Sequence, residues 1–305
     1  VSGDAGDSAD RLGNSERIDD GRQLVRTDVP LVLVLTSAGI DLADSELRSL
    51  LKEMPSSKRI LSLEPGAGST RELPRDELDR QRLVMPTLPL LRHAEVFEPL
   101  SDVLQEFGEA RQIAVTSRCT AVAGTVFARL FDAMSMIGAL MGTASRVDGA
   151  VSMPQRLSVP EELRSLRGDL SAHLRYEDGR SAVVSLSDRA GPWFRGMTIT
   201  GDGGCIRVTD WGFDWYDADG ELRDHHRVKP EAHELQVSGG ELFDPDTAPR
   251  PGAVAIGRAV KRWRDPHLPR PEAFDVGPAI AMCEAVGLSA RTGQPESPEV
   301  LLNMM

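Results

Sequence analysis

The run LVLVL at residues 31–35 constrains the fold more than any other feature of this chain. A strand that is apolar on both faces has to be covered on both faces, which is the situation of a strand in a parallel sheet. A second short run of this kind, at residues 59–63, follows a segment in which leucines recur at helical spacing. The order strand, helix, strand predicts an open α/β sheet in this part of the chain.

The same part of the chain is expected to form an incomplete domain. A third strand is predicted at residues 83–85, and a helix at residues 95–107 that ends at Gly108. Residues 1–22 are rich in Gly, Ser and Asp, so they cannot offset the entropy cost of ordering and are expected to be a mobile tail. Because no apolar strand followed by a glycine loop precedes residue 31, we expect residues 23–109 to be a partial Rossmann-like domain that lacks its beginning.

From residue 110 the sequence changes to a series of short strands. Turns rich in Gly and Asp separate seven strand-like segments, at residues 112–117, 146–152, 170–176, 181–187, 194–200, 205–209 and 213–216. Helices are predicted at residues 126–141, 253–263 and 274–286, and the first is apolar all round, which predicts burial. Residues 110–305 are therefore expected to form an α/β domain of α+β type, with a large, mostly antiparallel open sheet and flanking helices.

Composition and charge restrict the partners. The 305 residues are 40% hydrophobic and 27% charged, as in a globular protein, and the formal net charge is −12. Binding to nucleic acid or to an anionic membrane surface depends on clustered Lys and Arg, so neither partner is expected. The three cysteines, Cys119, Cys205 and Cys283, are far apart and follow no metal-binding spacing, so we expect reduced thiols, no metal and a cytoplasmic location.

Four stretches of the chain together resemble the Gfo/Idh/MocA oxidoreductases, the family of glucose-fructose oxidoreductase and inositol dehydrogenase. They are DVPLVLVLTSAGID, FARLFDAMSMIGALMG, the strand-rich stretch from HLRYEDG to WYDADG, and CEAVGLSARTGQPESP, and they span about residues 28–298. The resemblance implies a Rossmann-type domain joined to an α/β domain whose sheet often forms the oligomer interface. It also implies hydride transfer between NAD or NADP and a hydroxyl of a sugar or cyclitol.

The residues at the two catalytic motifs of that family differ here. Hydride removal from an alcohol needs a base for the hydroxyl proton, and the family uses a Lys in Glu-Lys-Pro and a His three residues before an Asp. In this chain the first motif reads LEP at residues 63–65, without the lysine, and the second reads RLFD at residues 129–132. Arg129 stands in the place of the histidine, and arginine keeps its proton near neutral pH.

Candidate cofactor-binding residues follow the two predicted parallel strands. Thr36 and Ser37 come after the first strand, and Glu64 and Pro65 come after the second. Ligands of α/β sheets bind at the carboxyl ends of the strands, so these four residues are the candidates for a nicotinamide nucleotide. A polar turn after a buried strand is also common for reasons of stability alone.

Candidate catalytic and substrate-binding residues come from three further places. His93 could transfer a proton and Arg92 could bind a carboxylate or phosphate, although a surface histidine or a helix cap is the alternative. Asp132 is the second catalytic candidate, and Arg118 and Arg129 are candidates for substrate binding. Because Arg129 and Asp132 lie three residues apart on one predicted helix, a structural ion pair between them is the alternative.

Two functions stay open at this point. The chain could be an oxidoreductase with NAD or NADP that acts on a sugar or cyclitol, or a non-catalytic sugar-binding, regulatory or subunit-partner protein on the same scaffold. The missing glycine loop predicts weak binding of the nucleotide or none. For both functions we expect a homo-oligomer through the C-terminal sheet, since an open sheet face of this length should be covered.

Overall fold

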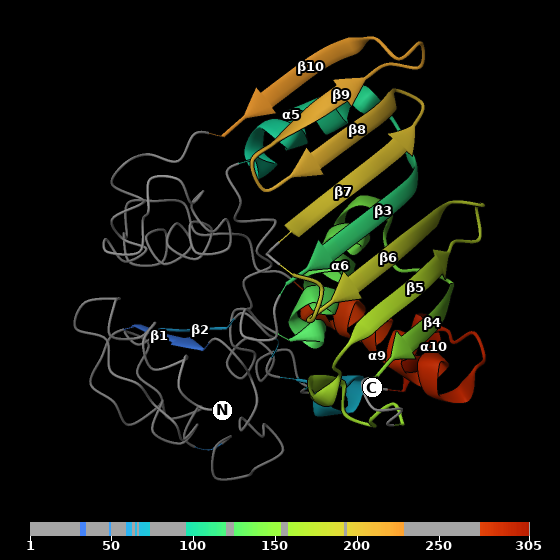
Figure 1. Cartoon of the computed structure of the whole chain (residues 1–305). Helices are drawn as coiled ribbons and strands as arrows, with labels where there is room; N and C mark the ends of the chain where they lie inside the picture. Colours follow the sequence, from blue (N-terminus) through green and yellow to red (C-terminus); the bar gives the residue numbers. More distant parts are fainter. Residues whose placement is uncertain are drawn as a thin grey trace.

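The computed structural model describes residues 31–34, 49, 59–62, 65, 67–73, 96–119, 125–153, 158–191, 194–228 and 275–304. These residues contain a two-stranded sheet and an eight-stranded sheet with the order β10-β9-β8-β7-β3-β6-β5-β4 (Figure 1). The mixed eight-stranded sheet, the parallel strand pair and the packed helices confirm the predicted fold class.

The two-stranded sheet contains the two apolar runs. Strands β1 (Leu31–Val34) and β2 (Arg59–Ser62) are parallel, with a register that runs from Leu31↔Arg59 to Val34↔Ser62. Parallel pairing is the arrangement that the apolar pattern predicts. The predicted tail, the third strand at residues 83–85 and the helix at residues 253–263 lie outside the described residues. The domain bounds stay predictions.

The eight-stranded sheet contains all seven strands expected after residue 110, each within two residues of its predicted ends. Its strands are β3 (Ala110–Arg118), β4 (Arg146–Ser152), β5 (Asp169–Arg175), β6 (Ser181–Ser187), β7 (Phe194–Gly201), β8 (Gly204–Thr209), β9 (Gly212–Tyr216) and β10 (Leu222–Arg227). Neighbours are antiparallel except β3 and β6, which are parallel. Strand β10 was not predicted, because its sequence LRDHHR lacks apolar alternation and it is an exposed edge strand.

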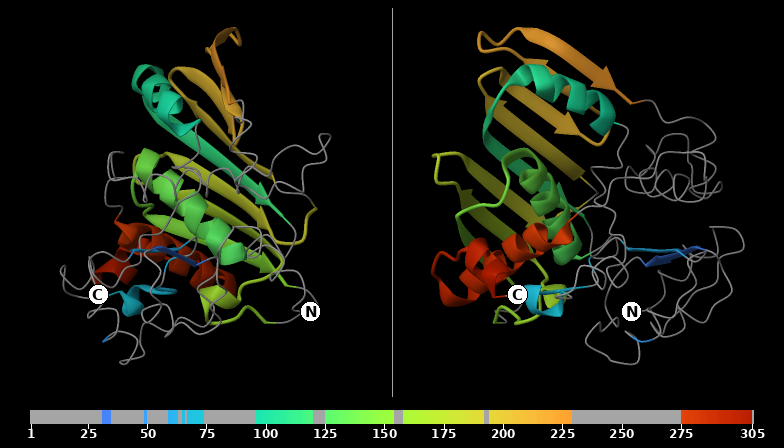
Figure 2. Two further views of the ribbon diagram at one scale, coloured as in Figure 1. Left: turned by 90° about the vertical axis from the view of Figure 1, so that its left-hand side faces the viewer. Right: turned by 180° about the vertical axis from the view of Figure 1, so that it is seen from behind.

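One face of the large sheet is covered by helices and the other is open among the described elements. Helices α5 (Phe97–Phe107), α6 (Val126–Met141) and α9 (Val276–Thr292) all lie on the same side, as both views in Figure 2 show. In β3 the residues Ile113 and Val115 are buried, whereas Gln112 and Ala114, which alternate with them, are exposed. This alternation places the apolar core between the sheet and the helices.

The ends of the helices have local causes. Helix α6 begins after Thr125, whose side chain accepts a hydrogen bond from the N–H of Ala128 at 3.0 Å, and it ends before Gly142, where φ is 78°. Helix α9 runs six residues further than expected, to Gly293 at φ 68°, and α10 (Pro298–Asn303) follows it. Among the described helices, none combines the length and apolar character that a membrane crossing requires.

Candidate functional site

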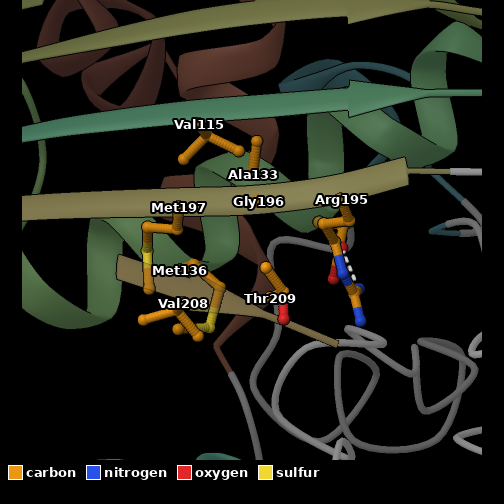
Figure 3. Close-up of a pocket in the computed structure, with 9 residues that line it drawn as sticks. Val115, Ala133, Met136, Arg195, Gly196, Met197, Val208 and Thr209 are labelled. Carbon is orange, nitrogen blue, oxygen red and sulfur yellow. Dashed lines mark hydrogen bonds and ion pairs between the residues drawn. The ribbon is translucent and has the colours of Figure 1, made fainter. Parts of the chain in front are cut away.

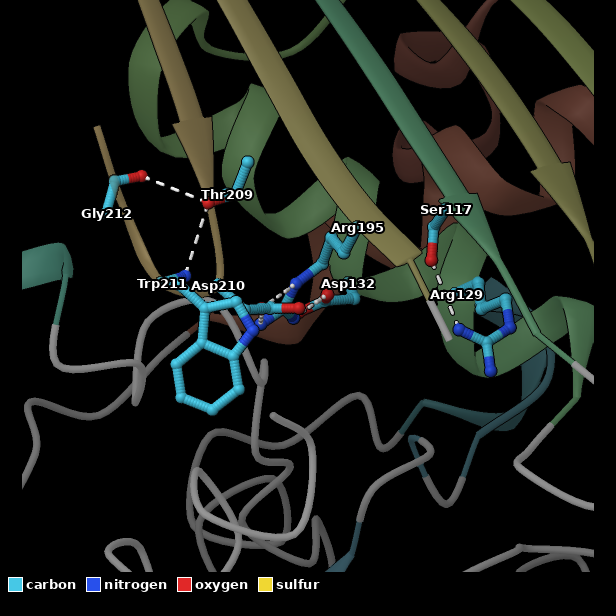
Figure 4. Close-up of polar contacts among 8 residues, drawn as sticks. All are labelled: Ser117, Arg129, Asp132, Arg195, Thr209, Asp210, Trp211 and Gly212. Atoms are coloured by element: carbon cyan, nitrogen blue, oxygen red, sulfur yellow. Dashed lines mark hydrogen bonds and ion pairs between the residues drawn. The ribbon is translucent and has the colours of Figure 1, made fainter. Parts of the chain in front are cut away.

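The second motif lies near the start of α6, on the side that faces the sheet. Arg129 and Asp132 are 5% and 9% exposed. Figure 4 shows both side chains directed towards the ends of strands of the large sheet, Arg129 towards Ser117 of β3 and Asp132 towards Arg195 of β7. The three-residue spacing on the helix therefore places both groups in one layer beneath the sheet.

Arg195 connects two buried carboxylates. Its Nη1 donates to Asp132 Oδ2 at 2.6 Å, its Nε donates to Asp210 Oδ1 at 2.8 Å, and its Nη2 also donates to Asp210. All three side chains are at most 12% exposed. We call Asp132, Arg195 and Asp210 the acid–arginine cluster. Its carboxylates are neutralised by a planar guanidinium, the geometry for which arginine is suited.

The charge of Arg195 depends on its two partners. Burial alone would lower the pKa of Arg195, but the carboxylates of Asp210 and Asp132 outweigh burial and raise that pKa above its ordinary value. The guanidinium therefore keeps its proton at every pH at which the protein is folded. In the acid–arginine cluster, the Asp132 carboxylate is committed to an ion pair.

A tight turn brings Asp210 to the cluster. The Thr209 hydroxyl donates to the Gly212 carbonyl at 3.4 Å and accepts from the N–H of Trp211 at 3.3 Å, as Figure 4 shows. Gly212 has φ 152°, and a Cβ atom there would lie 2.0 Å from the carbonyl oxygen of His226. Only glycine fits this position, so the β8–β9 turn holds Asp210 in a fixed place.

Arg129 lies beside the cluster. Its Nη1 donates to the Ser117 hydroxyl at 3.1 Å, and Ser117 is the cross-strand partner of Arg195. Burial lowers the pKa of Arg129, Cys119 and Asp132 act in the opposite direction, and the charge of Arg195 lowers it further. A guanidinium is nevertheless no proton acceptor near neutral pH. Arg129 therefore carries a positive charge into this layer but cannot take a proton.

Cys119 is the nearest thiol to this layer. It is fully buried, and its backbone N–H donates to the Ser187 carbonyl at 3.0 Å. Burial raises the pKa of the Cys119 thiol, and the charge and hydrogen bond of Arg129 only partly oppose this. Because the thiolate is the reactive form, burial keeps the Cys119 thiol in its less reactive, protonated form. None of the three cysteines is in a disulfide.

One cavity lies at the candidate site, and a second lies away from it. The first, drawn in Figure 3, is a space of about 10 Å³ between α6, β7 and β8, and Asp132 and Arg195 line one end of it. This is the size of about one water molecule, so a sugar does not enter beneath the sheet at this point. A groove of about 260 Å³ lies between α5 and strands β9 and β10, and none of the predicted site residues lines it.

The structure separates Arg118 from the other motif residues. Arg118 follows Ser117 in β3, and because successive side chains of a strand point to opposite faces, it lies on the open face of the sheet. There its guanidinium lies 5.1 Å from the centre of the Phe194 ring. Pro65 is buried, and the remaining candidates, Thr36, Ser37, Glu64, Arg92 and His93, lie outside the described residues.

The described residues include no lysine, and their histidines, His173, His225 and His226, lie in β5 and β10 rather than near Asp132. The Asp132 carboxylate is held by Arg195, and Arg129 is no base. Among the described residues no group of His, Cys, Asp or Glu could hold a metal ion.

Comparison with solved structures defines the class of fold. No family model and no curated protein matches the chain. A levoglucosan dehydrogenase in complex with NADH and levoglucosan superposes with a TM-score of 0.65 and 14% identity, covering 96% of this chain and 86% of that one. A putative myo-inositol dehydrogenase from Sinorhizobium meliloti 1021 gives a TM-score of 0.56 and 14% identity over 91% of this chain and 84% of that one.

A third structure extends the comparison. An oxidoreductase from Agrobacterium radiobacter in complex with NAD+, L-tartaric acid and magnesium gives a TM-score of 0.60 and 13% identity, over 91% of this chain and 82% of that one. The chain therefore has the fold of the sugar and inositol dehydrogenases of the Gfo/Idh/MocA type, which confirms the resemblance at the level of the fold.

Sequence reasoning missed two residues of the acid–arginine cluster, Arg195 and Asp210. A signal for Arg195 was present, because it is in phase with the buried residues Met197 and Ile199 of the same strand. A charged side chain on the buried face of a strand requires an opposite charge. The partner Asp132 could not be read from the sequence, since the ion pair spans 63 residues.

Proposed function

We propose that this chain binds a sugar-like or cyclitol-like ligand on the scaffold of a nicotinamide-dependent dehydrogenase, without efficient hydride transfer. The observation that carries the proposal is the ion pair of Asp132 with Arg195 at 2.6 Å, beside an arginine in the place of the family's histidine. The Asp132 carboxylate is held in a buried ion pair and Arg129 is already protonated, so neither group can take up the proton of an alcohol. The scaffold is retained, while Arg129 stands in the place of the motif histidine and Asp132 is held in an ion pair.

The replacement favours an anionic ligand. Arg129 puts a positive charge where a dehydrogenase of this type carries an imidazole, and Arg92 is a second candidate cation. Arginine binds carboxylates through two parallel hydrogen bonds. The similar oxidoreductase in complex with NAD+ and L-tartaric acid supports a carboxylate-bearing ligand, and the complex of levoglucosan dehydrogenase supports a sugar. The ligand class we propose is a sugar acid.

Calorimetric titration with D-glucuronate and with neutral myo-inositol tests this ligand class. We expect the wild type to bind D-glucuronate and Arg129→Met to bind it at least about tenfold more weakly, because one charge-assisted pair is lost. Arg111→Met, at an exposed ion pair with Asp202, is the matched control and should bind like the wild type. Tighter binding of myo-inositol, or an unchanged affinity in Arg129→Met, would contradict the proposal.

NAD or NADP is the cofactor that the resemblance implies, and the similar structures with NADH or NAD+ support it. Candidate contacts are Thr36, Ser37, Glu64 and Pro65. The glycines before residue 31 follow no apolar strand in the sequence, so we expect few backbone N–H groups to be gathered for the pyrophosphate. We therefore expect a dissociation constant for NADH well above the micromolar range. A micromolar constant in calorimetry would reject this expectation.

An active oxidoreductase is the second candidate function, and the complex of a similar dehydrogenase with NADH and levoglucosan favours it. In that case His93 is the proposed base. Substitution of His93 by alanine would then abolish NADH formation, whereas the non-catalytic proposal expects no NADH formation even in the wild type. For both candidate functions we propose a cytoplasmic location.

A further inference from the structure

A single carboxylate holds the turn after β2 against helix α9. Thr70 opens the short 3-10 helix η2 (Thr70–Glu72) and is 3% exposed. Its backbone N–H and its hydroxyl both donate to Oε2 of Glu284, each at 2.8 Å. Glu284 lies 214 residues further along the chain, in the middle of α9. Loss of this oxygen would leave two buried donors of Thr70 without their acceptor.

A second contact braces the same turn. Oε2 of Glu72 accepts from the N–H of Gly68 at 2.9 Å and forms an ion pair with Arg164 at 3.0 Å. Arg164 belongs to η5 (Leu163–Ser165), which packs on α9. The turn is therefore attached at two points, and both attachment points belong to the part of the chain that carries the large sheet.

Helix α9 is itself fixed to the sheet. The Ser289 hydroxyl accepts from the N–H of Gly149 in β4 at 3.0 Å, and Ser289 is fully buried. The two polar residues of the stretch Glu-Ala-x-x-x-Ser, Glu284 and Ser289, thus each bind a backbone N–H of a different element. They connect the turn after β2 and the edge strand β4 to one helix.

We propose that Glu284 is a positioning residue, which fixes the chain leaving the parallel strands relative to the eight-stranded sheet. Pro65, Ala67 and Gly68 are buried on the way from β2 to Thr70, so this segment is packed as well as tethered. The segment begins at the candidate residues Glu64 and Pro65. Any effect of Glu284 on ligand affinity rests on the proposed function, because it requires that Glu64 and Pro65 contact the ligand.

Hydrogen–deuterium exchange of peptides that cover residues 67–73 tests the position of the turn. Glu284→Ala should accelerate exchange there by roughly tenfold or more, because the acceptor of Thr70 is removed. Glu284→Gln should stay within about threefold of the wild type, since its amide oxygen can accept both bonds. Glu299→Ala, in the exposed first turn of α10, is the matched control and should not change exchange.

Exchange in β3 is measured in parallel, because slow exchange there shows that each variant is folded. If Glu284→Ala does not fold, Thr70→Val replaces it; this variant removes only the hydroxyl donor and should give a smaller acceleration. Wild-type exchange in Glu284→Ala or Thr70→Val, or exchange in Glu284→Gln as fast as in Glu284→Ala, would overturn the proposal.

Binding of D-glucuronate to the same variants separates this proposal from the proposed function. We expect about tenfold weaker binding in Glu284→Ala and restored binding in Glu284→Gln. A wild type that does not bind the sugar acid refutes the proposed function, while the exchange data still decide whether Glu284 holds the turn. Unchanged affinity in a Glu284→Ala variant with fast exchange refutes the role of Glu284 in ligand binding.

Discussion

The Arg195 side chain neutralises two carboxylates that come from different elements, Asp132 of α6 and Asp210 after β8. Breaking a buried ion pair by removal of one partner is costly, because the other charge stays in a medium that solvates it poorly. The guanidinium thus ties the helix layer to the ends of two strands. The Asp132 carboxylate, held by Arg195, therefore stabilises the fold.

Replacement of Arg195 tests this role. Arg195→Met should lower the free energy of unfolding by about 3–5 kcal/mol at pH 7, because two carboxylates lose their partner. Urea unfolding at pH 7 measures the difference. The exposed ion pair of Arg111 with Asp202 is the control, and Arg111→Met should change stability little.

Tyr176 provides a second prediction at this scale. Its hydroxyl donates to the Gly142 carbonyl at 3.2 Å, and burial raises the pKa of Tyr176 to about 12. A folded-state pKa above the unfolded value of about 10 stabilises the protein below pH 10, and this contribution is lost as the pH rises towards 12. Urea unfolding should show a steeper loss over this range in the wild type than in Tyr176→Phe. The same pH dependence of the free energy of unfolding in both proteins would contradict the raised pKa of Tyr176.

Helix α9 is the element that organises the packing of the described domain. A Cβ atom at Gly149 of β4 would lie 2.5 Å from the carbonyl oxygen of Val286, so helix and strand meet almost backbone to backbone. A Cβ atom at Gly287 would lie 2.5 Å from the Leu163 side chain. Small residues at these two points permit the close approach on which the Ser289 and Glu284 contacts depend.

Substitution of Gly149 by alanine tests the close packing. Gly149→Ala should destabilise the protein by about 1–3 kcal/mol, because backbone atoms have to move apart. Gly138→Ala in α6 is the contrast, since its new methyl group meets only the flexible end of Met282 at 3.2 Å. Replacing a glycine by alanine in a helix interior also raises the free energy of unfolding, by up to about 1 kcal/mol. Equal unfolding midpoints in urea for the two variants would contradict this account.

The sequence predicts the elements well where a local pattern defines them. Helix α6 and strands β4 and β6 have the predicted ends, because caps, turns and alternation lie within a few residues of one another. Strand β10 was missed because its sequence lacks apolar alternation. The last turns of α9 were missed because packing against Leu163, far along the chain, stabilises them. The contacts of the candidate site were missed for the same reason.

The whole molecule has one sheet face that no described helix covers. Across this face the register aligns Asp148, His173, Val183, Ala114, Thr198, Arg207 and Asp214 in one row over seven strands. The centre of the row is small and uncharged, with Val183 39% exposed, and charged groups stand at both ends. A two-fold axis would place the small centres together, which supports the proposed homo-oligomer.

A charge at the centre of this row should separate the subunits. We expect the wild type to be a dimer or larger in light scattering, and Thr198→Arg to be a monomer, since a buried unpaired arginine opposes association. Gln294→Arg adds the same charge at an exposed site after α9 and should not change the mass. A wild type that is monomeric at high micromolar concentration would refute the predicted interface.

The central claim is that a dehydrogenase scaffold has an ion pair and an arginine where proton transfer would take place. The most direct test is whether the wild-type chain forms NADH or NADPH with neutral sugars, sugar acids and cyclitols. The absorbance of the reduced nicotinamide measures the rate. The account predicts no rate above that of the buffer. Turnover on the order of 1 s⁻¹ or faster with any of these substrates would contradict it.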